Sequence, residues 1–308
     1  MLKATVLVTV ALSLFVTRPA AADSKSWTAV KRSVSPKAAI VFGFNLDPIR
    51  ATGSYAAALK MFLAESNEAN QAFELIKTSC QIDVATAISD ATVIMKLDEK
   101  PLVVLGLNGL DEPKVIDCME KIVKSFAGGG PAPTLTAKKK GKVTEYSAPG
   151  EAKKIYVAWL AADVVAFTDD PGDKGKLTKM LTGGAAKGAL GTMIGKVSTS
   201  AAVWAAVVKK ADAPFGTFTG GYGAVEISGG TISASGHMTL SKPAEATAGA
   251  TAGNAKLVEA KAEFAKIPAA VKLMDTIKIV ASGKLIDITG SIADKDILAL
   301  LPQLESIF

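Results

Sequence analysis

The stretch that decides the fold is residues 80–118, CQIDVATAISDATVIMKLDEKPLVVLGLNGLDEPKVIDC. Residues 90–98 alternate apolar and polar side chains, which is the pattern of a strand with one buried face. Residues 102–107 are apolar on both faces, so they predict a second, central strand. Asp111 can cap a helix, and Pro113 suits a first helical turn because its missing N–H has no partner there. The stretch therefore predicts two strands followed by a helix.

The same order of elements returns later in the chain. Residues 223–228 and 231–240 predict two strands joined by the tight turn Gly229-Gly230. Ser241 and Pro243 introduce a helix in the same relation as Asp111 and Pro113, and Pro243 follows Pro113 by 243 − 113 = 130 residues. This fixed offset predicts two diverged copies of one β-hairpin–helix–β-hairpin unit.

Strands joined by tight turns predict antiparallel sheets with helices packed on one face, which is the α+β class. We expect the first copy at residues 23–196 and the second at residues 197–308. The sequence leaves open whether the copies share one sheet or form two lobes. Residues 23–36 look loosely ordered, and the Ala/Gly/Lys/Glu-rich residues 242–266 predict one long helix.

Residues 1–22 have the features of a secretory signal peptide. Lys3 precedes the apolar run Ala4–Val16, and Pro19–Ala22 gives a small-residue pattern that predicts cleavage after Ala22. A retained anchor is the alternative. No later segment is apolar over a membrane-spanning length, so we expect no membrane span in the mature chain and a periplasmic or secreted location.

The basic residues argue against nucleic acid as a partner. Removal of residues 1–22 leaves a formal charge of 33 − 29 = +4, and Arg32 and Arg50 are then the remaining arginines. Arginine is the residue that reads guanine and phosphate through paired hydrogen bonds. The local basic cluster Lys138–Lys140 with Lys142 favours an exposed strand edge that resists aggregation. Contact with an anionic membrane surface is the alternative.

Two cysteines in an exported chain predict a disulfide. Cys80 and Cys118 are 38 residues apart, and closing such a loop stabilises the fold by about 4 kcal/mol in the chain-entropy model. We expect the bond to join the segment before the first hairpin to the helix after it. Two buried free thiols are the alternative.

Candidate catalytic and metal-binding residues form no recognisable pattern. His237 is the single histidine, and Ser235 would share its sheet face, but the chain has no G-x-S-x-G nucleophile elbow. Zinc sites need several Cys or His residues. The acids within Asp169–Asp173 lack the closing acid of a calcium loop, so they favour a turn and a helix cap. Gly191–Lys196 lacks the spacing of a phosphate loop. We therefore expect no catalytic residue, metal or cofactor.

The signal peptide, the two-copy plan and the paired cysteines of the first copy resemble exported proteins of unassigned function from myxobacteria-like Gram-negative bacteria. That resemblance implies a periplasmic or secreted location and no chemistry. The first functional hypothesis is a non-enzymatic binding or scaffold module of the cell envelope, with an envelope protein as its partner. The second is a carrier of an apolar small molecule or lipid, because Gly/Ala-rich helices leave room beside a sheet. The third is a hydrolase that uses Ser235 and His237.

Overall fold

The computed structural model describes residues 23–35, 37–95, 101–126, 136–147, 154–168, 177 and 188–304. The expected signal peptide, the Gly/Pro-rich residues 127–133 and the acids Asp169–Asp173 lie outside these residues. The elements before residue 197 are α2 (Lys25–Val30), β1 (Ile40–Asn45), α3 (Leu46–Arg50), α4 (Gly53–Glu65), α5 (Asn67–Cys80), α6 (Val84–Ala87), β2 (Ile88–Met95), β3 (Leu102–Leu107), α7 (Glu112–Phe126), β4 (Thr136–Lys140), β5 (Val143–Ser147), β6 (Lys154–Ala161), β7 (Val164–Thr168) and α9 (Gly188–Ile194). The later elements are β8 (Val203–Val207), β9 (Ala211–Ala213), β10 (Gly216–Ser228), β11 (Thr231–Leu240), α10 (Pro243–Glu263), α11 (Pro268–Thr276), β12 (Lys278–Ser282), β13 (Leu285–Ala293) and α12 (Asp294–Leu304).

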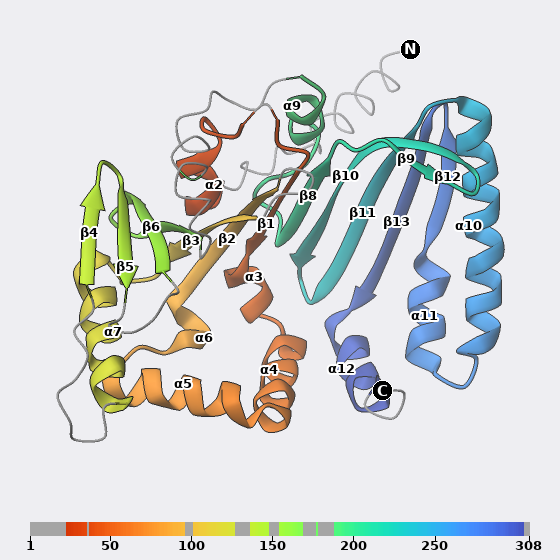
Figure 1. Ribbon diagram of the computed structural model, residues 1–308. Coiled ribbons are helices and arrows are strands. Elements are labelled where there is room, and N and C mark those ends of the chain that lie inside the picture. The colour runs from red at the N-terminus through yellow and green to blue at the C-terminus, as the bar shows by residue number, and fades with distance from the viewer. Residues whose placement is uncertain are drawn as a thin grey trace, which may run out of the picture.

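Within the described residues, thirteen strands form one antiparallel sheet in the order β12-β13-β11-β10-β8-β1-β2-β3-β7-β6-β5-β4, with β9 paired to β10 (Figure 1). The α+β class is therefore confirmed. Strands β1 and β8 pair at the centre, with Phe42 opposite Ala205, so the two predicted copies share one continuous sheet. The strands on the two sides of this pair are arranged alike. One side reads β1-β2-β3-β7-β6 and the other reads β8-β10-β11-β13-β12, and on each side the last two strands stand in reverse chain order. Descent from one repeated unit, and the boundary near residue 197, stay predictions.

The two faces of the sheet are covered by different helices. We call the face that carries Val41 and Trp204 the α2 face, because these residues pack with Trp27 of α2 in the main core. Leu190 of α9 belongs to the same core. On the opposite face, which we call the groove face, Ile286 of β13 packs against α10 in a second core. The sequence predicted helices on one face of the sheet, whereas the structure has helices on both: α10 on the groove face, and α2 and α9 on the α2 face.

The segment after the expected cleavage site is part of the main core, so the expectation that residues 23–36 are loosely ordered was wrong. Trp27 and Val30 of α2 are 4% and 1% exposed, and Val34 is fully buried. The amide of Ser26 donates to Oδ1 of buried Asp90 over 2.7 Å. Helix α2 has six residues, which is too short to show a helical period in the sequence.

The helices near residues 80–118 and 242–276 differ in detail from the prediction. Cys80 is the last residue of α5 and forms a disulfide with Cys118 of α7, with their Cα atoms 5.0 Å apart, so the predicted pairing is confirmed. The long helix expected at residues 242–266 ends at Glu263. A second helix, α11, starts at Pro268, where the proline occupies the first turn without losing a hydrogen bond.

Candidate functional site

Apolar side chains run across almost the whole groove face. Residues that are opposite each other in neighbouring antiparallel strands share a face, so the register defines a continuous row. The row from β12 to β4 is Ile279, Ile288, Gly236, Gly223, Ala205, Phe42, Val93, Val103, Phe167, Val157, Thr144 and Lys139. Its central members from Phe42 to Phe167 are half-buried rather than covered. The sheet therefore presents a long apolar surface on this face.

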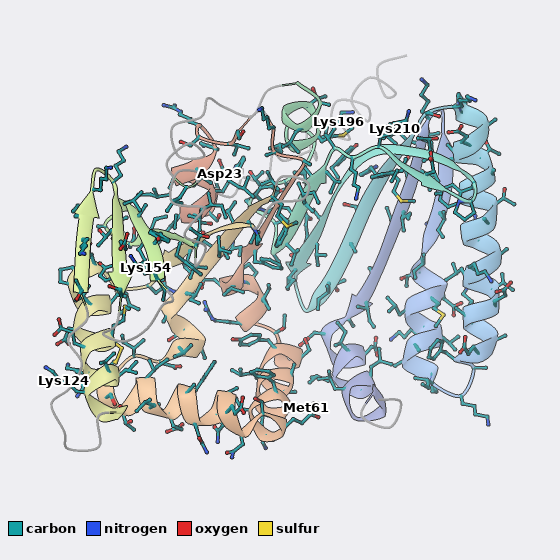
Figure 2. All side chains as sticks on the ribbon, viewed as in Figure 1. Asp23, Met61, Lys124, Lys154, Lys196 and Lys210 are labelled. Carbon is teal, nitrogen blue, oxygen red and sulfur yellow. A yellow bond between two sulfur atoms is a disulfide. The ribbon has the colours of Figure 1, made fainter. Side chains whose placement is uncertain are left out.

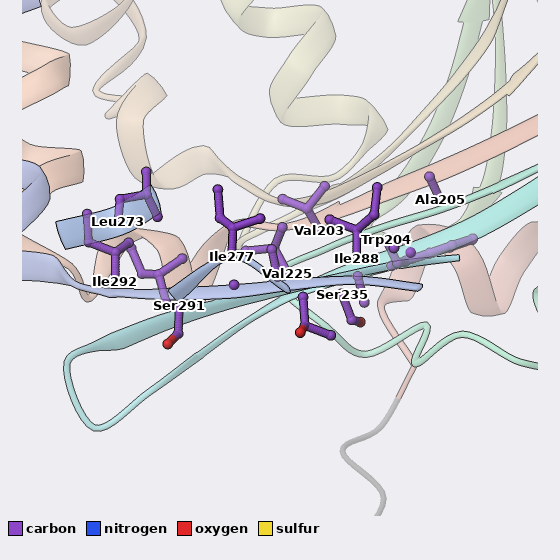
Figure 3. A pocket seen from close by; sticks show the side chains of 17 residues that line it. Val203, Trp204, Ala205, Val225, Ser235, Leu273, Ile277, Ile288, Ser291 and Ile292 are labelled. Carbon is purple, nitrogen blue, oxygen red and sulfur yellow. The ribbon is translucent and has the colours of Figure 1, made fainter. Parts of the chain in front are cut away.

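The surface is hollowed into an apolar groove between α11 and the strands β8, β10, β11 and β13. Its volume is about 480 Å³, within the range of pockets that bind small molecules. Figure 3 shows the side chains of Leu273, Ile277, Val203 and Ile288 on one side of the sheet around this space. Ser235 and Ser291 border the groove through their backbone, because their side chains point to the other side of the sheet in the same view. No charged residue belongs to its lining among the described residues.

Glycines on three neighbouring strands make the floor of the groove. A Cβ atom added to Gly236 would meet no heavy atom within 4 Å, so open space lies above it. At Gly290 a Cβ would lie 3.3 Å from Cγ1 of Ile277, the residue that directly follows α11. At Gly223 it would meet the carbonyl oxygen of Ser235 at 2.7 Å. Open space above the groove floor is therefore shown at Gly236, whereas Gly223 is required by the close approach of the Ser235 carbonyl.

A contact between α4 and α12 joins the two parts of the chain beside the groove face (Figure 1). The Oδ2 and Oδ1 atoms of Asp294 accept hydrogen bonds from the amides of Gly53 and Ser54 at 2.7 and 3.1 Å. These amides open α4, so a carboxylate more than two hundred residues away caps this helix together with Thr52, which accepts from the amide of Tyr55. The hydrogen bonding of Ser54, and then of Gly53, lowers the pKa of Asp294 despite its desolvation.

The opposite, α2 face of β11 holds the residues that the sequence offered as a hydrolase. Ser235 and His237 do share this face, as expected from their spacing. The Nδ1 atom of His237 lies 2.6 Å from Oδ1 of Asp287, and Tyr222 stacks on the imidazole with ring centroids 4.4 Å apart. The sequence did not identify Asp287, because it lies 50 residues from His237 and only the pairing of β11 with β13 brings them together.

A complete nucleophile–base–acid relay is not assembled on this face. Among the contacts of the described residues, Ser235 Oγ has no hydrogen bond to the His237 ring. A nucleophile is activated when its hydroxyl lies within hydrogen-bond reach of the base. What this face does hold is a contact between three neighbouring strands: Tyr222 of β10 stacks on His237 of β11, and His237 pairs with Asp287 of β13.

Side chains of the types that bind metal ions are not clustered in the described residues either. In the part of the chain that the structure describes, no group of three or more His, Cys, Asp and Glu side chains is placed to hold a metal ion. The aspartates at 169–173 lie outside that part, so the predicted turn and helix cap stay a prediction.

None of the described helices is long and apolar enough to cross a membrane.

Comparisons with known proteins give a likeness of fold only. No family model matches the chain, and none of the curated proteins matches it. Among solved structures, crystal form III of protein TP0453 is similar, with 11% sequence identity, a TM-score of 0.48, and coverage of 87% of this chain and 94% of that chain. Crystal form IV of the same protein gives 11% identity and a TM-score of 0.47, covering 90% and 99%. Likeness at this level assigns no activity to the chain.

Proposed function

We propose that this chain is an exported, non-enzymatic binding protein of the cell envelope that holds an apolar ligand in the groove on its groove face. The observation that carries the proposal is a groove of about 480 Å³ whose lining is apolar and contains no charged side chain among the described residues. Soluble proteins rarely leave a contiguous apolar surface uncovered unless that surface binds something.

The chemistry of the lining defines the class of ligand. Burial of a charged or strongly polar group in such a groove would cost several kcal/mol without a partner, on the order of 2–7 kcal/mol even for an amide or hydroxyl. The part of the ligand inside the groove is therefore a hydrocarbon chain, as in the acyl chain of a lipid. The apolar row that continues over Phe42 and Val93 gives a longer chain further surface to follow.

The disulfide and the predicted signal peptide support an envelope location. Disulfides persist in oxidising compartments and are rare in the cytosol. The Cys80–Cys118 bond and the export signal expected at residues 1–22 are thus consistent with each other.

A groove-filling variant tests the proposal. Gly236→Leu places a branched side chain in open space on the groove face. We expect binding of a fluorescent long-chain fatty acid to the mature protein to weaken at least tenfold, because each displaced methylene is worth about 0.8 kcal/mol. Ser233→Leu is the matched control, since it adds the same side chain to the same strand on the α2 face, where Ser233 pairs with Glu226.

The two variants separate the outcomes. Loss of binding in Gly236→Leu alone supports a ligand in the groove. Equal binding by both variants, or no fatty-acid binding by the mature protein, contradicts it. Native mass spectrometry of protein purified without detergent adds an independent check: an extractable lipid mass supports the carrier, whereas an apo mass with a bound envelope protein favours the scaffold hypothesis.

A further inference from the structure

The edge strand β4 and its turn carry a cluster of four lysines that form no ion pair among the described residues. Lys138, Lys139 and Lys140 follow one another in β4, and Lys142 lies in the turn to β5. We call these four residues the lysine hairpin. All four side chains are exposed, as are Thr136 and Ala137 of the same strand. The sequence prediction of an exposed lysine-rich edge thus agrees with the position of β4 at the end of the sheet (Figure 1).

The lysine hairpin has no acidic partner among the described residues. Glu145 is opposite Lys138 in the register of β4 and β5, but its Oε1 atom accepts a hydrogen bond from Nζ of Lys154 over 2.7 Å. Lys154 lies on β6, the strand next to β5 (Figure 2), and its hydrogen bond with Glu145 raises the pKa of Lys154. The ion pairs of the described residues include none of the four lysines of the hairpin.

The lysines are distributed on both faces of the hairpin. Successive strand residues point to opposite faces, so Lys138 and Lys140 lie on the face opposite Lys139. Lys139 ends the cross-sheet row of the groove face through Thr144 and Val157. Strand β4 pairs with β5 alone, so nothing in the described part of the sheet covers its outer edge.

We propose that the lysine hairpin docks the protein on an anionic membrane surface. The same lysines discourage pairing at the edge, and because all four are exposed and without an ion pair among the described residues, their positive charge is also available to anionic headgroups. Lysine is a compact point charge on a flexible stem, suited to a diffuse layer of anionic headgroups rather than to one shaped ligand. Each lysine near such a surface raises partitioning about fivefold, corresponding to about 1 kcal/mol. This docking does not depend on a ligand in the groove.

Vesicle binding by the mature chain tests the inference. We expect sedimentation with vesicles that contain phosphatidylglycerol at low salt, and none with pure phosphatidylcholine vesicles. Lys139→Gln/Lys140→Gln should weaken binding roughly 25-fold, from about fivefold per lysine. Lys209→Gln/Lys210→Gln is the matched control, because it removes two adjacent exposed lysines from the link between β8 and β9, where Figure 2 shows Lys210.

The inference is overturned if the two double variants lose affinity equally, since net charge alone would then explain binding. It is also overturned if the protein binds a soluble sulfated polysaccharide but not anionic vesicles, or if the hairpin variant aggregates with its vesicle affinity unchanged. Gly236→Leu should keep full vesicle binding, so failure of the groove proposal and failure of the docking proposal give different results.

Discussion

Gly43 in the central strand β1 offers a sharp test of how the two parts of the chain are joined. Gly43 is opposite Trp204 of β8 in the register of the central pair. Trp204 is 1% exposed, and its ring meets the edge of Trp27 with centroids 5.0 Å apart. A Cβ atom on Gly43 would lie 2.5 Å from Cε2 and 2.8 Å from Cζ2 of this indole. Gly43→Ala therefore forces the indole against the α2 segment.

The expected cost follows from two opposing effects. Adding atoms to a well-packed core costs about 1–3 kcal/mol, and the upper end applies here because a rigid buried ring must move. Replacing glycine by alanine returns about 0.4–1 kcal/mol through the unfolded chain. We expect Gly43→Ala to lower the free energy of unfolding by about 2 kcal/mol.

Urea unfolding followed by tryptophan fluorescence measures this change. Gly236→Ala is the matched control, because it is also a strand glycine but its Cβ would have no neighbour within 4 Å. We expect the control to be neutral or slightly stabilising, with the same dependence of unfolding free energy on urea. If the two variants agree within about 0.5 kcal/mol, a range usual for surface changes, the packing of Trp204 across Gly43 is wrong.

Three further predictions concern the helix cap, the disulfide and the histidine. Asp294→Asn should lower the free energy of unfolding by about 1 kcal/mol through the weakened cap of α4. Because the folded-state pKa of Asp294 is lowered, its contribution to stability is complete above the unfolded pKa of about 3.9 and is lost as pH falls through the folded pKa. The variant should therefore lose less stability than wild type in acid. Cys80→Ser/Cys118→Ser should cost about 4 kcal/mol in urea unfolding, and reductant should bring wild type to the same midpoint, whereas an unchanged midpoint after confirmed reduction would count against a stabilising bond. His237→Ala should leave hydrolysis of a short-chain nitrophenyl ester at the wild-type level, and a rate that depends on His237 would refute the non-enzymatic proposal.

Local patterns in the sequence predicted the main elements well where one face of an element is buried. The strand at 102–107 and the helix after Pro113 are present as β3 and α7, and the hairpin over Gly229-Gly230 joins β10 to β11. The disulfide was predictable because two cysteines in a chain with an expected export signal have one possible pairing.

The sequence by itself also showed that the residues of familiar catalytic sites are few, since it has one histidine and no nucleophile-elbow motif. Only the tertiary structure decided that β1 pairs with β8 and unites the chain in one sheet, because strand pairing depends on contacts between residues distant in sequence. The same long-range pairing brings Gly223, Gly236 and Gly290 together as the floor of the groove, although they are far apart in the sequence. It also places Asp294 at the first turn of α4 and buries Trp27 against Trp204, which no local period could predict.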